Sequence, residues 1–238
     1  AVLLHTPGAE VENMTPKMAQ RALYSDILNL SIAQEEYKQL SGVLSRLAKV
    51  YSVHDLLVKV LDNEVERQAL VGKICVMEQV TDYFDMLMEM SSAKLAKVLI
   101  EGLPAKINTL TSFLNEDYYA LFPLYNFYFT RDAAVTIGDN ALICKMANKV
   151  RMRESLIMEA IYKGSGEFEC GIINAYDHQP GNTNLYMEGG DILIAREDIL
   201  LIGNGMRTST QGIDMLASRL GALAPEGRRH IIVQQLPH

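Results

Sequence analysis

Ala134-Val-Thr-Ile-Gly-Asp-Asn-Ala-Leu-Ile-Cys144 is the stretch of sequence that decides the fold. Two short apolar runs flank a polar turn, and Gly138 and Asp139 are residues typical of a hairpin turn. A helical pattern follows and is predicted to begin near Arg151. The stretch therefore predicts a strand, a tight turn, a second strand and then a helix.

The same order of elements occurs a second time. Ile192-Leu-Ile-Ala195, a turn at residues 196–198 and Ile199-Leu-Leu-Ile202 predict another hairpin, followed by a helix that begins near Thr208. The copies lie about 58 residues apart, which makes them an internal repeat of a ββα unit. Because one such unit cannot bury both of its faces, several copies must pack together. A last strand, His230-Ile-Ile-Val233, is expected to begin a further unit.

The chain before these repeats is predicted to be mainly helical. Val2 to His5 is predicted to be a short strand, and Thr15-Pro16 marks the start of a helix. A longer helix is predicted from Ser31, which would form a capping box with Gln34. The apolar residues of this helix have the spacing of one helical face: Ala33, Tyr37, Leu40, Leu44 and Leu47.

Residues 54–121 have repeated helical spacing and no alternating strand pattern. This stretch is predicted to be an all-helical insert. The expected division of the chain is therefore 1–53 for a first unit, 54–121 for the insert and 122–238 for further repeat units.

Composition narrows the class of protein. With 22 basic and 29 acidic residues the net charge is −7, so we expect no nucleic-acid partner. No apolar run reaches the roughly 18 residues that a membrane span needs, so we expect no membrane partner. The three cysteines lack the spacing of a disulfide framework or a zinc site, which favours no metal and a cytoplasmic location. Since no initiator methionine precedes Ala1, the chain is expected to begin inside a longer protein.

Each repeat has an acid and an arginine at matching positions. Asp132 precedes Arg151 by 19 residues, and Glu188 precedes Arg207 by the same number. An arginine at the start of a helix favours an anion such as a carboxylate, and nearby acids favour a cation. Together they predict a pocket for a small molecule with one charge at each end. The alternative is that these residues form ordinary surface ion pairs.

Two histidines are interpreted without a binding role. His178, in a polar loop, is expected to be solvated, and His5 is expected to be a residue at the end of a strand.

Four segments resemble the arginine deiminases of the guanidine-modifying (pentein) superfamily, in order and spacing. The first is Asn126-Phe-Tyr-Phe-Thr-Arg-Asp132. The others are Val2-Leu-Leu-His-Thr-Pro-Gly8 with Glu12-Asn-Met-Thr-Pro16 after it, Glu188-Gly-Gly-Asp191, and Ile202-Gly-Asn-Gly-Met-Arg-Thr-Ser209. The resemblance spans nearly the whole chain.

This resemblance implies an α/β fold, an incomplete five-bladed α/β propeller of ββαβ units with an all-helical insert. The family has such an insert where residues 54–121 are predicted to be helical. By resemblance, agmatine deiminases and dimethylarginine hydrolases lack it, which favours arginine deiminase.

The resemblance also implies roles for single residues. Asp132 would hold the guanidinium of L-arginine and Glu188 would orient a catalytic histidine. Asn126, Arg151 and Arg207 would bind the carboxylate of the substrate. Phe129 would pack against its aliphatic part, and Leu23 would lie near its amino group. Arg131 and Asp191 would be structural partners.

The chemistry implied by the resemblance is hydrolysis of L-arginine to L-citrulline and ammonia. A cysteine thiolate attacks the guanidinium carbon, which water alone attacks poorly because resonance spreads the charge over three nitrogens. Water then hydrolyses the covalent amidino intermediate. Neither a metal nor an organic cofactor is implied.

The chain departs from the family pattern in two ways. The family's His-x-Asp segment and its nucleophilic cysteine lie after the strand that here ends at His238, and none of Cys75, Cys144 and Cys170 matches the nucleophile. The family's paired aspartates correspond here to Tyr24-Ser25-Asp26. These 238 residues alone are therefore expected to bind arginine weakly, to give no turnover, and to associate as a homo-oligomer through exposed strand edges. An amidinotransferase and a non-catalytic arginine-binding pseudoenzyme are the alternatives.

Overall fold

The computed structural model describes residues 1–12, 14–15, 18–19, 22–106, 109–114, 118–177, 184–223 and 229–237. The predicted helix start at Pro16 and the solvated His178 lie outside the described residues. The chain forms two compact units, Ala1–Tyr128 and Phe129–His238. The finer division at residues 53 and 121 stays a prediction.

The first unit contains a small parallel sheet joined by a long helix. Strand β1 (Val2–Leu4) pairs with β2 (Val50–Ser52), and helices α1 (Ala9–Glu12) and α3 (Leu30–Leu47) lie between them in the chain. The predicted strand at Val2 is confirmed. Strand β2 was not predicted, because three residues are too few to show an alternating pattern.

Helix α3 begins one residue earlier than predicted. Its N-cap is Asn29, whose side chain accepts a hydrogen bond from the Ile32 amide, so the expected capping box from Ser31 is wrong. The apolar face is mostly open to solvent. Only Tyr37 of this face is buried, whereas Leu47 is 79% exposed. The helical period was therefore predicted correctly.

The predicted insert is largely helical. Its helices are α4 (Val53–Leu61), α5 (Glu64–Glu78), η1 (Thr81–Tyr83), α6 (Phe84–Met88), α7 (Ser92–Glu101) and α8 (Leu110–Leu114). Helices α4 and α7 pack together, and Leu57, Leu95 and Leu99 are fully buried. The expectation of an all-helical stretch is nevertheless wrong, because β3 (Leu103–Pro104) and β4 (Tyr119–Leu121) form an antiparallel pair. A two-residue strand ending in proline gives no strand pattern that could be recognised in the sequence.

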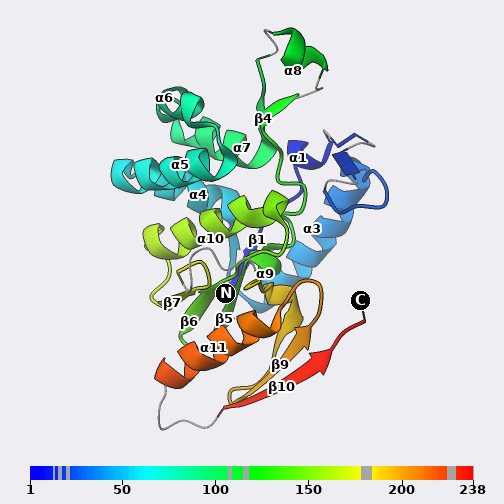
Figure 1. The fold of residues 1–238 in the computed structure, drawn as a ribbon, viewed down its shortest axis with the longest axis vertical. Coiled ribbons are helices and arrows are strands. Elements are labelled where there is room, and N and C mark those ends of the chain that lie inside the picture. Colours follow the sequence, from blue (N-terminus) through cyan, green and yellow to red (C-terminus); the bar gives the residue numbers. More distant parts are fainter. Residues whose placement is uncertain are drawn as a thin grey trace. The chain divides into compact units, whose positions relative to one another are not determined.

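The second unit consists of two ββαβ repeats with the same strand order (Figure 1). The first contains β5 (Ala134–Ile137), β6 (Asn140–Ile143), η2 (Lys149–Arg151), α10 (Met152–Gly164) and β7 (Gly171–Asn174). The second contains β8 (Ile192–Arg196), β9 (Ile199–Asn204), α11 (Thr210–Leu223) and β10 (His230–Gln235). Both predicted hairpins and both helices that follow them are confirmed.

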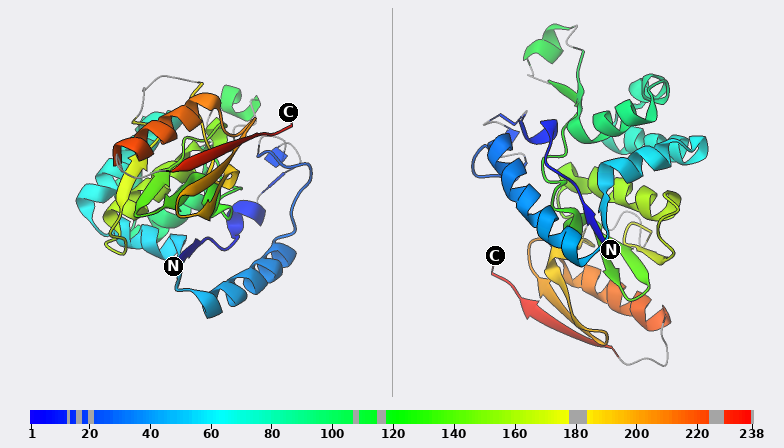
Figure 2. Two further views of the ribbon diagram at one scale, coloured as in Figure 1. Left: turned by 90° about the horizontal axis from the view of Figure 1, so that it is seen from below. Right: turned by 180° about the vertical axis from the view of Figure 1, so that it is seen from behind.

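The fourth element of each repeat was missed or misassigned. Strand β7 pairs in parallel with β6, and β10 pairs in parallel with β9. Strand β10 therefore completes the second repeat, and the expectation that it begins a further unit is wrong. Figure 2 shows β10 as the outer strand beside β9, where Ile232 and Val233 are about half exposed.

The helices cover the hairpins from which they follow. Helix α10 packs on β5 and β6, where Leu142 and Ile157 are fully buried. Helix α11 packs on β9 in the same way. Each fully buried aliphatic side chain contributes roughly 1.5–3 kcal/mol to the free energy of folding, so this packing stabilises both repeats. Among the described residues, no helix combines the length and the apolar character that crossing a membrane requires.

Candidate substrate-binding site

A buried arginine lies among three buried carboxylates in the second unit. The Arg151 Nη1 atom donates to Asp132 Oδ2 at 2.8 Å and lies 3.6 Å from Glu188 Oε2. Its Nε and Nη2 atoms donate to Glu154 at 3.1 and 2.8 Å. None of the four side chains is more than 11% exposed. The cluster is therefore a shielded charged site, unlike a surface ion pair.

Local structure brings these groups together. Asp132 lies on the short helix α9 (Thr130–Ala133), and Glu188 directly precedes the turn η3 (Gly189–Asp191). Arg151 ends η2, whose start is capped by the Asn148 side chain, and Glu154 lies in the first turn of α10. Helix α9 just before the first hairpin, η2 and the first turn of α10 thus supply three of the charges, and the residue that precedes η3 supplies the fourth.

The two glycines after Glu188 allow this segment to approach α9. A Cβ atom on Gly189 would lie 2.1 Å from the Arg131 carbonyl oxygen, and one on Gly190 would lie 2.4 Å from Asp132 Oδ1. Real Cβ contacts are longer, so a side chain at either position would force the two segments apart. The Glu-Gly-Gly-Asp motif therefore brings Glu188 and Asp132 to the same site.

Replacing Gly189 with alanine is expected to lower the free energy of unfolding by about 2–3 kcal/mol, because the clash is with backbone rather than with a flexible side chain. The matched control is Gly221→Ala. Gly221 lies in α11 with open space around its Cβ position, and alanine there should raise stability by about 0.5–1 kcal/mol. Urea unfolding of both variants measures the difference, and equal stabilities would contradict the packing role.

Further hydrogen bonds hold the Glu188 segment. The Glu188 amide donates to Thr208 Oγ1 at 3.2 Å, and that hydroxyl donates to Asp191 Oδ2 at 2.8 Å. Arg131 Nη2 donates to the Ile192 carbonyl at 2.6 Å. Arg131 and Asp191 thus make contacts within the scaffold, in agreement with the structural role that the resemblance implies for them.

The cluster holds more negative than positive charge, and this shifts its protonation. Burial raises the pKa of Glu154 to about 7, outweighing the attraction of Arg151. Burial also raises the pKa of Glu188, and the charge of Asp132 adds to this. Burial alone would lower the pKa of Arg151, but the carboxylates, Glu154 first, raise it, so this guanidinium stays charged. The site therefore favours a second cation.

The raised pKa of Glu154 gives a pH prediction. The protonated Glu154 carboxyl group stabilises the folded protein. This stabilisation is complete below the pKa of about 4.5 that Glu154 has in the unfolded chain, and it is lost as the pH rises through about 7. Glu154→Gln removes this titration, so the stability of the variant relative to wild type should rise between pH 4.5 and 7, by at most about 2–3 kcal/mol. Urea unfolding at several pH values tests this, and a pH-independent difference would contradict it.

Glu154 was not among the residues predicted from the sequence. The available signal was the spacing Arg151-x-x-Glu154 at the start of a helix, which places the two side chains on one face. Such pairs are common on exposed helices, and only burial separates this one from them.

Arg207 and Phe129 lie at the edge of this site. Arg207 is exposed in the turn before α11, and its charge partly offsets the rise that burial causes in the pKa of Glu188. Phe129 is 48% exposed and forms the N-cap position of α9. Their contacts with a substrate stay predictions.

The remaining two predicted residues lie together in the first unit. Asn126 is buried, and its Nδ2 atom donates to the Ala22 carbonyl at 2.8 Å. Leu23, which follows Ala22 in the chain, is 57% exposed and has a positive φ of 67°, which is unusual for a leucine. The hydrogen bond from Asn126 to Ala22 thus links the Asn126 segment to the loop of Tyr24-Ser25-Asp26. A second link is the hydrogen bond of 2.5 Å between the hydroxyls of Tyr24 and Tyr128.

The three thiols are poorly suited to nucleophilic attack. Burial raises the pKa of Cys144, and the charges of Glu188 and Asp132 raise it further. Burial likewise raises the pKa of Cys75 and of Cys170. A raised pKa leaves less of the reactive thiolate near neutral pH. That none of these cysteines is the nucleophile stays a prediction.

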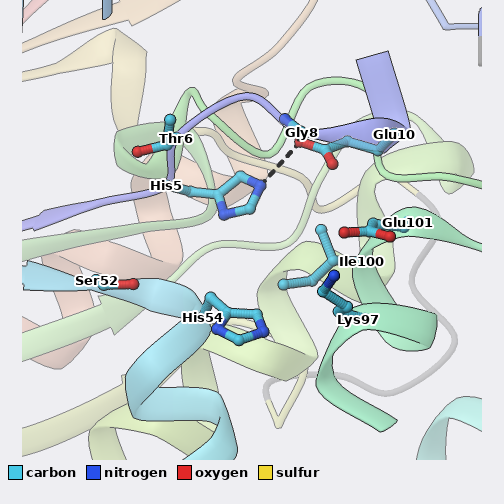
Figure 3. Close-up of a pocket in the computed structure, with 9 residues that line it drawn as sticks. All are labelled: His5, Thr6, Gly8, Glu10, Ser52, His54, Lys97, Ile100 and Glu101. Atoms are coloured by element: carbon cyan, nitrogen blue, oxygen red, sulfur yellow. Dashed lines mark hydrogen bonds and ion pairs between the residues drawn. The ribbon is translucent and has the colours of Figure 1, made fainter. Parts of the chain in front are cut away.

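A separate pocket of about 230 Å³ lies in the first unit (Figure 3). His5, expected only to end a strand, is buried there and pairs with Glu10 at 3.0 Å. The lining residues are His5, Thr6, Gly8, Glu10, Ser52, His54, Lys97, Ile100 and Glu101. In the part of the chain that the structure describes, no three potential metal ligands converge.

The fold and the site together define a mixed α/β protein of ββαβ repeats with a buried carboxylate cluster around an arginine. The chain belongs to the arginine deiminase family, whose model, described as arginine deiminase, matches residues 20–238.

Similarity to individual arginine deiminases extends along the chain. The protein of Pediococcus pentosaceus is 32% identical over 251 residues, covering 100% of this chain and 60% of that protein. That of Bacillus cereus is 33% identical and that of Borrelia recurrentis 30% identical, each covering 92% of this chain and 56% of the relative. The chain thus spans 56 to 60% of the length of these relatives.

Two solved structures show weaker similarity. A dimethylarginine dimethylaminohydrolase from Pseudomonas aeruginosa, complexed with citrulline, is 19% identical with a TM-score of 0.37, covering 59% of this chain and 58% of that one. An amidinotransferase from Microseira wollei is 16% identical with a TM-score of 0.35, covering 44% of this chain and 34% of that one.

Proposed function

We propose that the full-length protein hydrolyses the guanidinium group of L-arginine to give L-citrulline and ammonia. One observation carries the proposal. Asp132 and Glu188 lie buried beside one guanidinium group, that of Arg151, at 2.8 and 3.6 Å. Membership of the arginine deiminase family supports the same substrate and reaction.

Each predicted residue has a role in this proposal. Asp132 holds the substrate guanidinium through charge-assisted hydrogen bonds, and Glu188 orients the histidine that moves protons. Arg151, Arg207 and Asn126 bind the α-carboxylate, Phe129 packs on the aliphatic chain and Leu23 lies near the amino group. Because Arg151 already donates to Asp132, arginine binding exchanges one guanidinium for another at this carboxylate.

The proposed reaction has two covalent steps. A cysteine thiolate adds to the guanidinium carbon, and the bond from that carbon to a terminal nitrogen breaks as ammonia leaves with a proton from the histidine. Water then adds to the amidino carbon, and the carbon–sulfur bond breaks to release citrulline and the thiol. Cys75, Cys144 and Cys170 do not match the family's nucleophile in sequence, and burial raises the pKa of each thiol, so we propose that the nucleophile belongs to a part of the full-length protein outside these 238 residues.

The same proposal includes the family architecture. The two ββαβ repeats would be two blades of a five-bladed α/β propeller that surrounds the substrate. The repeats share one strand order, as blades of such a propeller require.

The test is a citrulline assay of the full-length protein with L-arginine as sole substrate. Citrulline and ammonia in equal amounts are expected. Product only in the presence of an acceptor amine would indicate amidino transfer, and arginine binding without turnover would indicate a pseudoenzyme. The 238-residue chain assayed alone is expected to give no citrulline, and isothermal titration should show only weak binding of arginine.

A further inference from the structure

Glu154 fixes one edge of the Arg151 guanidinium. Its Oε1 atom accepts from Nε at 3.1 Å, and its Oε2 atom accepts from Nε at 3.2 Å and from Nη2 at 2.8 Å. The carboxylate is 1% exposed and lies in the first turn of α10. Paired bonds of this kind set the plane of a guanidinium as well as its position.

The opposite edge of Arg151 faces the other acids. Nη1 donates to Asp132 Oδ2 at 2.8 Å and lies 3.6 Å from Glu188. With the Nε–Nη2 edge held by Glu154, Arg151 cannot present that edge to Asp132 as a second pair of bonds. Arg151 thus meets Asp132 through Nη1 rather than through a bidentate pair, and such a contact is easier to exchange for a ligand.

We propose that Glu154 is a positioning residue for arginine binding, holding the Nε–Nη2 edge of Arg151 so that Nη1 keeps a fixed position from which it binds the carboxylate of the ligand when Asp132 takes up the ligand guanidinium. The inference rests on the proposed function above. Glu154 acts through Arg151 and touches no substrate atom. Without the Glu154 charge this fixed orientation of Nη1 is lost, so the contact with the ligand carboxylate is weakened.

This role predicts a selective defect in Glu154→Gln. In the full-length protein, KM for L-arginine should rise about tenfold or more while kcat changes less than about threefold, since ground-state binding is lost. Agmatine has the guanidinium but no carboxylate, so its inhibition constant against arginine should change less than about twofold. Glu154→Asp, which keeps the charge, should recover most of the affinity for arginine.

The matched control is Glu159→Gln. Glu159 is also buried on α10, but it bonds Asn174 and Lys163, and its replacement should leave KM unchanged. A merely structural role for Glu154 would weaken arginine and agmatine alike and lower kcat, and that result would overturn the proposal. If Glu154→Gln does not fold, Glu154→Asp decides: it should retain most of the affinity for arginine, and a tenfold or larger loss shared by arginine and agmatine would contradict the proposal.

The test separates this inference from the proposed function. A wild-type protein that binds arginine without releasing citrulline would refute hydrolysis, while calorimetry with arginine and agmatine would still measure the effect of Glu154. Wild-type turnover with no selective change in Glu154→Gln would leave the function standing and refute the positioning role. Absence of any arginine binding by the full-length protein would overturn both.

Discussion

Replacing Arg151 with methionine is expected to lower the free energy of unfolding by about 3–5 kcal/mol near neutral pH. The substitution removes the buried cation that pairs with three buried carboxylates, of which Glu154 is 1% exposed and Glu188 3% exposed. Methionine retains much of the volume of the arginine stem, so lost packing contributes little. The cost comes from leaving uncompensated charges away from water.

The deficit of Arg151→Met should depend on pH. Without Arg151 the pKa of Glu154 rises beyond its value of about 7, because the guanidinium is what lowers it. A carboxyl group with a raised pKa loses stability as the pH increases, so the deficit should be largest near pH 8 and should shrink towards pH 5.

Urea unfolding of wild type and variant at pH 5 and pH 8 measures this. Arg196→Met is the matched control, because Arg196 pairs with Asp198 on an exposed turn and its loss should leave stability unchanged. A deficit below about 1 kcal/mol, or the same deficit at both pH values, would show that the cluster is not held together by the Arg151 charge.

Elements with a local signal were predictable from the sequence. The hairpin of β5 and β6 was found because two apolar runs flank Gly138-Asp139, and Gly138 does adopt a positive φ of 58°. Strand β7 was missed because only Ile172 and Ile173 are apolar between polar or flexible neighbours. Parallel pairing is also long-range, and nothing in His230-Ile-Ile-Val233 indicates that this strand pairs with β9 rather than with a later strand.

Charged residues were predictable as candidates but not in their arrangement. The equal spacing of acid and arginine selected Asp132, Arg151, Glu188 and Arg207. The structure places Glu188 beside Arg151, the arginine of the other repeat, while Arg207 is exposed. This pairing of Glu188 with the arginine of the other repeat depends on Gly189 packing against the Arg131 backbone. Such a tertiary contact cannot be recognised from sequence periodicity.

The exposure of the apolar face of α3 likewise could not be predicted from sequence periodicity. Its period indicates a helix, but a helix of this length with only Tyr37 buried shows that period and burial are separate properties. The Asn29 cap was overlooked for a related reason, since Asn29 and Ser31 are both good capping residues and only the backbone decides between them.

Replacing Asp132 with asparagine is expected to lower kcat/KM for L-arginine by about 10³-fold in the full-length protein. Asparagine has nearly the same shape, but it lacks the charge that would hold the guanidinium and one of the two acceptor oxygens. It also removes one of three clustered carboxylates, and the charge of Asp132 raises the pKa of both Glu154 and Glu188. The variant should therefore fold as well as wild type, so that the loss of activity reports on catalysis rather than on stability.

Citrulline formation as a function of arginine concentration, with an unfolding curve for each protein, makes the comparison. Asp139→Asn is the matched control, because Asp139 lies exposed in the turn between β5 and β6 and its charge should not affect the site. Retention of more than about a tenth of the wild-type kcat/KM by Asp132→Asn would remove Asp132 from the guanidinium-binding role. Because Arg151 loses a partner in this variant, the carboxylate-binding side of the site should be more available, and any residual arginine binding should depend on the ligand carboxylate more strongly than in wild type.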